Sequence, residues 1–339
     1  MTKKDKAKEL WNHCFTDGKA FTELYFQKRY TDENTLSLTK GEQMIAMLQL
    51  LPYPFQFLNK QVDTAYISGA CTHPEYRQQG AMRKLLTQSL EHLQKSEIPI
   101  CTLIPAEEWL FGYYQKSGFE TIFYNSTYSI DVPKYKHESN VVVTFNHTFN
   151  QDSYDYLHKK WMKKKAAILH PVTDFEVILA DLQLAEGQVF TAHIKNEVVG
   201  VAIAYYNPED KKIHVNELAS RDICINQELF EAMSKYFSTN ELVVIAPPYD
   251  DKKRKLGMLR IIQAKEILTL FAESKPLWET DFYLKDPILV NNQGAYQVKE
   301  GKLTYTQRDK RTTDKLVSIN DLASLLFEPL DPYMSLMLN

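Results

Sequence analysis

The sequence predicts a protein of the α/β (α+β) class, in which helices pack on mixed sheets. Two similar mixed-sheet units are followed by a small third unit. Its 339 residues, 44% of them hydrophobic and 12% aromatic, exceed what one compact domain usually holds. A series of helical and strand patterns fills the first third and restarts after a charged stretch at 133–140. We therefore predict domains at residues 1–137, 138–276 and 277–339.

The first unit opens with two helices and continues with two strands. Apolar residues recur at helical spacing around 10–15 and 21–26, separated by Thr16-Asp17-Gly18, which is typical of a turn. Residues 44–50 and 65–71 have the apolar content of strands, and the second strand runs toward a turn that ends at Gly80.

The residues after Gly80 predict a helix and then a strand, which complete a strand–helix–strand unit. Apolar side chains between Met82 and Leu93 fall on one helical face, and the apolar segment 98–104 comes directly after them. Such a crossover requires parallel strands and places the start of the helix at the carboxyl edge of the sheet, where open α/β sheets bind ligands. We expect the functional site there.

The second unit repeats this order, and the third is smaller. A helical region is predicted around 154–169, before a hairpin at 189–206 and a third strand at 213–218. In the third unit, strands are predicted near 282–284, 296–298 and 303–305, with a helix at 321–327.

The segment Arg77-Gln78-Gln79-Gly80-Ala81-Met82, between the strand and the helix, is suited to a phosphate group. Free backbone N–H groups and the helix dipole attract anions at a helix N-terminus. Gly80 allows close approach of the backbone, Ala81 keeps the next position small, and Arg77 adds a positive charge. An ordinary turn has a similar composition, but the position between parallel strands favours a phosphate site.

A second candidate lies in Tyr113-Tyr114-Gln115-Lys116-Ser117-Gly118-Phe119, at the end of a helix predicted over 107–115 and capped by Gly118. A tyrosine here would reach the edge of the sheet, where its hydroxyl can donate a proton. The alternative is a buried aromatic residue with a satisfied hydroxyl group.

Together these segments resemble the GNAT family of acetyl-CoA-dependent N-acetyltransferases, which have an R/Q-x-x-G-x-G/A loop and a later Y-x-x-x-G-F segment. The resemblance covers residues 64–124, with Met82 where the family usually has a small residue. It implies that backbone amides of the loop hold the pyrophosphate of acetyl-CoA and that a strand edge pairs with its pantetheine arm. The implied cofactor residues are Ala70, Cys71, Thr72, Arg77, Gln78, Gln79, Gly80, Ala81 and Met82.

The whole chain resembles the Eis (enhanced intracellular survival) group, which joins tandem GNAT domains to a sterol-carrier-like domain. Segments 257–262, 285–287, 291–296 and 318–323 carry this likeness. It implies a homo-oligomer that acetylates primary amines of aminoglycosides, polyamines or lysine-like groups, which would be small-molecule or peptide acceptors. By the same resemblance, the general acid is Tyr114, which would protonate the leaving thiolate, and the base is the C-terminal carboxylate, here of Asn339.

The tail that would carry this carboxylate is apolar. Tyr333-Met334-Ser335-Leu336-Met337-Leu338 favours docking over the fraying that is usual for a terminus, because these side chains gain by burial.

Candidates for an acceptor pocket come mostly from the two opening helices. Aromatic rings can stack on a bulky amine and an aspartate can hold its charge, although an aromatic stripe at helical spacing more often forms a core. The candidates are Trp11, Phe15, Asp17, Tyr25, Phe26 and Trp109.

The second unit has no matching phosphate loop. Its segment 219–226 contains no glycine and places Asp222 where a phosphate would lie. We therefore expect one cofactor site in the chain.

Composition and charge limit the classes of function that the chain can have. A net charge of −3 without charge blocks favours neither nucleic acid nor membrane binding, and four dispersed cysteines without histidine clusters suggest no metal, no disulfide framework and a cytoplasmic protein. Two alternatives remain open: an aminoacyl or long-acyl transferase of tandem GNAT type, and a non-catalytic module that binds CoA or lipid.

Overall fold

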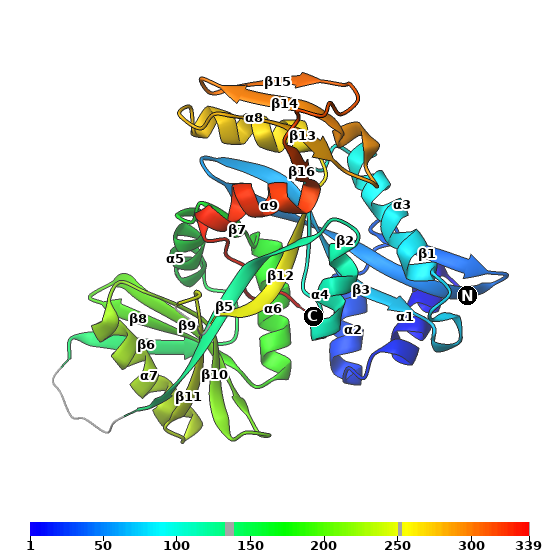
Figure 1. Cartoon of the computed structure of the whole chain (residues 1–339). Helices are drawn as coiled ribbons and strands as arrows, with labels where there is room; N and C mark the ends of the chain where they lie inside the picture. Colours follow the sequence, from blue (N-terminus) through cyan, green and yellow to red (C-terminus); the bar gives the residue numbers. More distant parts are fainter. Residues whose placement is uncertain (133–138, 250–252, 339) are drawn as a thin grey trace.

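A computed structural model describes residues 1–132, 139–249 and 253–338 (Figure 1). Within them, the chain forms one 12-stranded mixed sheet and a separate 4-stranded sheet. This arrangement confirms the predicted α/β fold class. The strand order of the large sheet is β1-β2-β3-β4-β12-β5-β11-β10-β9-β8-β6, with β7 paired to β2 off this path.

The first half of the large sheet is covered by helices on both faces. Alternate residues of a strand point to opposite faces: Met47 packs with the opening helices, whereas Leu48 packs with α3. The elements are α1 (Lys3–Cys14), α2 (Lys19–Lys28), β1 (Thr35–Lys40), β2 (Gln43–Phe57), β3 (Lys60–Thr72), α3 (Ala81–Lys95), β4 (Ile100–Leu103), α4 (Glu108–Gln115) and β5 (Glu120–Asp131).

The strand between β4 and β5 comes from far along the chain. β12 (Arg254–Ile261) pairs antiparallel with both, so that Met258 lies opposite Leu103 on one side and Thr121 on the other. β12 belongs by sequence to the predicted domain 138–276, yet it completes the sheet of the first half. The domain boundaries themselves stay a prediction.

The second half contains the same kind of parallel strand–helix–strand crossover as the first. β5 continues into it and pairs with β11, and β10 and β11 are parallel strands joined through α7. The elements are β6 (Val141–Asn146), α5 (Gln151–Met162), β7 (Ala166–Ile168), α6 (Val172–Leu184), β8 (Gln188–Ile194), β9 (Glu197–Asn207), β10 (Lys212–Ser220), α7 (Ile223–Phe237) and β11 (Glu241–Ala246).

The predicted helix at 154–169 is wrong in its last part. The helix α5 ends at Met162, and Ala166–Ile168 forms β7, which pairs with Phe55–Phe57 of β2. Alanine favours a helix locally, but the pairing with β2 buries all three side chains of β7 and determines the outcome.

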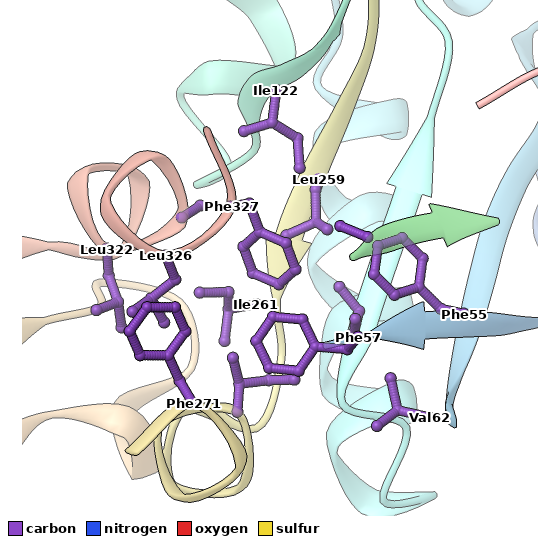
Figure 2. Packing of buried hydrophobic residues seen from close by; sticks show 14 of the residues in the cluster. Phe55, Phe57, Val62, Ile122, Leu259, Ile261, Phe271, Leu322, Leu326 and Phe327 are labelled. Carbon is purple, nitrogen blue, oxygen red and sulfur yellow. The ribbon is translucent and has the colours of Figure 1, made fainter. Parts of the chain in front are cut away.

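The third unit packs against the first half. Phe271 of α8 and Phe327 of α9 meet Phe57 of β2 in one apolar core (Figure 2). The helix α8 (Ala264–Ser274) precedes the predicted unit in the chain, and the unit itself contains β13 (Thr280–Lys285), β14 (Gly294–Lys299), β15 (Lys302–Thr306), β16 (Leu316–Ser318) and α9 (Ile319–Phe327). The likeness of this unit to a sterol-carrier domain stays a prediction.

A buried ion pair connects β12 to the third unit. Arg260 is fully buried, and its Nη2 donates to both carboxylate oxygens of Asp286 at 2.6 and 2.7 Å. Asp286 also accepts from the backbone N–H groups of Ile288 and Leu289. Because burial of either charge without its partner is costly, the pair has to form in the folded state.

We expect Asp286→Ala to lower the free energy of unfolding by about 3–5 kcal/mol, because it leaves a buried guanidinium without its counter-ion. Urea unfolding followed by circular dichroism measures the change. Glu108→Ala is the control, since it removes the exposed Lys255–Glu108 pair and should leave the unfolding midpoint almost unchanged. An equally small shift for Asp286→Ala would contradict this role of the ion pair.

Candidate functional site

The predicted glycine loop begins α3 at the end of β3. Gly80 is the N-cap residue of α3, in the left-handed conformation with φ 80°, and no side chain caps the helix. The first N–H groups of an α-helix have no acceptor within the helix. A Cβ added to Gly80 would meet nothing within 4 Å, so the space in front of these donors is open.

Two side chains shape the loop before Gly80. Arg77 Nε donates to the carbonyl oxygen of Thr72 at 3.2 Å, and Gln79 Nε2 donates to that of Glu75 at 2.9 Å. Gln78 has φ 62°, a left-handed conformation that turns the backbone toward the helix axis. The loop is exposed from Arg77 to Gly80, as an anion site requires.

Strands β3 and β4 separate next to this loop. Their parallel pairing joins Thr64–Tyr66 to Ile100–Thr102 and does not continue beyond Tyr66. The edge of β3 from Ile67 to Thr72 is therefore not paired with β4, and its backbone groups can pair with an extended ligand. The predicted residues Ala70, Cys71 and Thr72 lie on this edge.

The pairing of β3 with β2 is irregular at the same place. The register shifts between Met47 and Gln49, opposite Gly69, which has φ 58°. A Cβ on Gly69 would overlap the indole ring of Trp11, so the glycine allows α1 to pack closely on the strand.

Tyr114 lies on the α3 side of the sheet, near the loop. One apolar cluster contains Tyr114 and Leu85, with Ala70, Ala81 and Met82 packed against it. Burial raises the pKa of Tyr114, which keeps its hydroxyl protonated at neutral pH. Tyr114, Ala70 of β3 and the first residues of α3 thus lie in or against one apolar cluster.

The end of α4 is fixed by Gly118 and Arg260. Gly118 has φ 85°, and a Cβ there would lie 2.6 Å from Nε of Arg260. The same Nε donates to the carbonyl oxygen of Ser117 at 3.1 Å. The glycine of the Y-x-x-x-G-F segment therefore lets a buried arginine of β12 hold the turn that follows Tyr114.

The acceptor candidates of the opening helices lie mostly in a core. Trp11, Tyr25 and Phe26 are 1–3% exposed, with Phe15 packed beside them. Asp17 accepts a hydrogen bond from Nε1 of Trp11 at 2.8 Å, and Trp109 is exposed, with its Nε1 donating to Glu107. Their burial favours a structural role for the first three, and the acceptor pocket stays a prediction.

The C-terminal tail is docked as far as the structure describes it. Tyr333 N donates to the carbonyl oxygen of Ala166, and Ile168 N donates to that of Tyr333. Met334 and Leu338 are 4% and 7% exposed. Met334 packs beside Gly257 of β12, which adjoins Leu103 at the end of β4. The predicted base, the carboxylate of Asn339, lies outside the described residues.

Two buried polar residues of the second half hold Ser335, and sequence reasoning missed both. Glu217 accepts from Oγ of Ser335 at 2.6 Å and from the hydroxyl of Tyr333 at 2.7 Å. On the other side, Nε2 of His170 donates to the Ser335 carbonyl oxygen at 2.9 Å. Burial raises the pKa of Glu217, and the hydrogen bonds from the tail oppose this effect. A carboxylate inside an otherwise apolar strand pattern was the available signal.

We expect Glu217→Ala to release the tail, since it removes two hydrogen bonds to a charged acceptor, together worth about 3 kcal/mol. Hydrogen exchange at the Ile168 and Tyr333 amides should then become about 100-fold faster. Tyr333→Phe, which removes one of the two bonds, should give a smaller increase. Unchanged exchange in both variants would mean that Glu217 does not hold the tail.

In the second half, the start of α7 corresponds to the start of α3. An acidic side chain, Asp222, occupies this position in place of the open glycine loop. Asp222 is the N-cap of α7, and its carboxylate accepts from the N–H groups of Cys224 and Ile225 at 3.0 and 3.1 Å. The hydrogen bond from Arg221 and those from the helix lower the pKa of Asp222. These donors are therefore already used, as expected if the second half holds no cofactor.

Among residues 1–132, 139–249 and 253–338, no group of three or more His, Cys, Asp or Glu side chains could hold a metal ion. Within the same ranges, every helix is too short or too polar to cross a membrane.

Residues 2–122 match the family model of the acetyltransferase (GNAT) domain. The matched segment contains the glycine loop, the free edge of β3 and Tyr114. This part of the chain is therefore similar to a GNAT acetyltransferase domain. No curated protein matches the chain in sequence.

Solved structures share the fold over nearly the whole chain. A GCN5-related N-acetyltransferase from Anabaena variabilis ATCC 29413 has a TM-score of 0.75 at 18% identity, covering 95% of this chain and 86% of that one. One from Kribbella flavida has 0.75 at 18%, covering 99% and 95%. Eis1 from Mycobacterium abscessus has 0.71 at 12%, covering 95% and 86%. At these identities the likeness establishes the fold.

Proposed function

We propose that this protein transfers an acetyl group from acetyl-CoA to a primary amine. The observation that carries the proposal is the open N-terminus of α3 behind Gly80, at the point where β3 and β4 separate, with Tyr114 in the same cluster. This arrangement provides donors for a pyrophosphate, a free strand edge for an extended arm and a protonated hydroxyl group for a leaving thiolate.

The residues of the loop fit acetyl-CoA. Backbone N–H groups from Gln78 to Met82 would hold the pyrophosphate, assisted by Arg77, and the edge Ala70–Thr72 would pair with the pantetheine arm. Acetyl-CoA supplies the acetyl thioester. Met82 is half-buried against the α3 cluster, so its side chain does not fill the space in front of Gly80.

The transfer needs one acid and one base. The amine nitrogen attacks the thioester carbonyl, a C–N bond forms and the C–S bond breaks. Tyr114 would give its proton to the departing sulfur. The base that takes the amine proton would be the carboxylate of Asn339, where the chain ends at that residue. The hydrogen bonds of Tyr333 and Ser335 with Glu217 and His170 support this role, because they hold the tail where Met334 packs beside Gly257 of β12.

The acceptor class is an amine of the aminoglycoside, polyamine or lysine-like kind. Release of CoA, followed with a thiol reagent against a panel of such amines, tests the proposal. We expect saturable, amine-dependent release from acetyl-CoA. A panel of acyl donors forms the second arm: strong turnover with a long-chain or aminoacyl donor and none with acetyl-CoA would overturn the choice of donor.

A further inference from the structure

Two cysteines lie side by side at the end of β3, next to the glycine loop. Cys14 is the last residue of α1, and its thiol donates to the carbonyl oxygen of Thr72 at 3.4 Å. Cys71 precedes Thr72 in β3 and is 7% exposed in the apolar cluster against which Cys14 packs. Cys14 itself is half-buried and open to small reagents.

The loop arginine reaches the same point. Nε of Arg77 donates to the carbonyl oxygen of Thr72, the atom that Cys14 Sγ also contacts. Arg77 from the loop and His13 from α1 both lie near Cys14, with the ring of His73 next to that of His13. The positive charge of Arg77 favours the thiolate form of Cys14, which is the reactive form, over the thiol that donates to Thr72.

The two thiols have different roles. The hydrogen bond from the Cys71 thiol, together with Arg77, lowers the pKa of Cys14 to about 7. The same contact raises the pKa of Cys71, which stays protonated. At pH 7, Cys14 is therefore about half thiolate, compared with about 3% for an unperturbed cysteine. Cys14 is the nucleophile of the pair.

We propose that Cys14 and Cys71 form a peroxide-reactive dithiol whose reactivity is linked to acetyl-CoA binding through Arg77. The link, but not the dithiol chemistry, rests on the proposed function. The Cys14 thiolate attacks one oxygen of hydrogen peroxide, an S–O bond forms and the O–O bond breaks, and the departing hydroxide takes a proton to become water. The sulfur of Cys71 then attacks Cys14 sulfur, and the S–S bond forms as water leaves with the Cys71 proton. Two thiols are oxidised to one disulfide and one peroxide is reduced to two waters.

Arg77 links the reactivity of Cys14 to the binding of acetyl-CoA. The pyrophosphate of acetyl-CoA and the Cys14 thiolate both attract the same guanidinium group. Bound acetyl-CoA should therefore make the thiolate less favourable, and by reciprocity the thiolate should weaken acetyl-CoA binding. If binding returns Cys14 to the behaviour of an ordinary thiol, its alkylation at pH 7 slows by about tenfold.

The test uses the full chain with Cys224→Ser, which removes the exposed cysteine of α7. Reduced protein is treated with hydrogen peroxide at pH 7, digested without reductant and analysed by mass spectrometry. We expect a Cys14–Cys71 disulfide, reversed by a dithiol reductant. The added Cys71→Ser change should stop the reaction at a sulfenic acid on Cys14, trapped by a 1,3-dione. The added Cys14→Ser change should leave Cys71 unreacted.

Oxidation of Cys71 in the Cys14→Ser variant would overturn the proposal that Cys14 and Cys71 form a peroxide-reactive dithiol. Absence of the disulfide in the parent would overturn it as well. The link is tested separately by iodoacetamide labelling of Cys14 with and without acetyl-CoA. Equal labelling in protein that calorimetry shows to be saturated overturns the link through Arg77. Failure to bind acetyl-CoA at all would instead overturn the proposed function, while the disulfide map still decides the dithiol.

Discussion

We expect Tyr114→Phe to lower kcat for the proposed acetyl transfer by about 100- to 10,000-fold, the contribution of a positioned general acid. The phenyl ring keeps the packing of Tyr114 in the apolar cluster with Leu85 and Phe119, so the fold is retained. The lost hydroxyl is the group that would protonate the thiolate. Since the pyrophosphate donors are untouched, the Kd for acetyl-CoA should not change. Steady-state kinetics and calorimetry measure the two quantities.

Tyr113→Phe is the matched control for this prediction. Tyr113 is the preceding residue of α4, its ring lies 5.4 Å from that of Tyr114, and burial raises its pKa as well. Loss of its hydroxyl should change kcat little. Normal turnover in Tyr114→Phe, or an equal loss in both variants, would show that Tyr114 is not the acid.

We expect Gly80→Glu to weaken the proposed acetyl-CoA binding by more than about 100-fold. A side chain at φ 80° is strained by about 1–2 kcal/mol, and a carboxylate placed before the helix N-terminus repels the pyrophosphate and competes for its donors. Because the variant no longer binds acetyl-CoA, acetyl-CoA should no longer stabilise its folded state against thermal unfolding. Calorimetry and thermal unfolding with and without acetyl-CoA measure both effects.

Gly41→Glu provides the same substitution away from the loop. Gly41 has φ 59°, lies between β1 and β2, and would meet nothing within 4 Å of an added Cβ. It therefore reproduces the strain and the added charge, and its Kd for acetyl-CoA should match that of the unmodified protein. Parental affinity in Gly80→Glu would mean that acetyl-CoA binds elsewhere.

Features that depend on neighbouring residues were predictable from the sequence. Gly80 before α3, Gly118 after α4 and the hairpin at 189–206 lie where local patterns placed them, because helix caps and tight turns are determined by a few adjacent residues. The glycine loop and Tyr114 were predicted as site candidates for the same reason, since each lies at the end of a regular element.

Long-range pairings were not predictable in this way. The segment at 254–261 could be read as apolar, but nothing in it indicates insertion between β4 and β5. β7 was mistaken for helix because its partner, β2, is distant in sequence. Glu217 and Cys14 were missed because their partners, Ser335 and Cys71, are brought close only by the folded chain.

Calorimetric titration of the unmodified protein with acetyl-CoA tests the central claim most directly. The open loop at Gly80 and the Asp222 cap of α7 together predict one molecule of acetyl-CoA bound per chain, with heat lost in Gly80→Glu and retained in Gly41→Glu. Two molecules per chain, or none, would contradict a single cofactor site in the first half of the molecule.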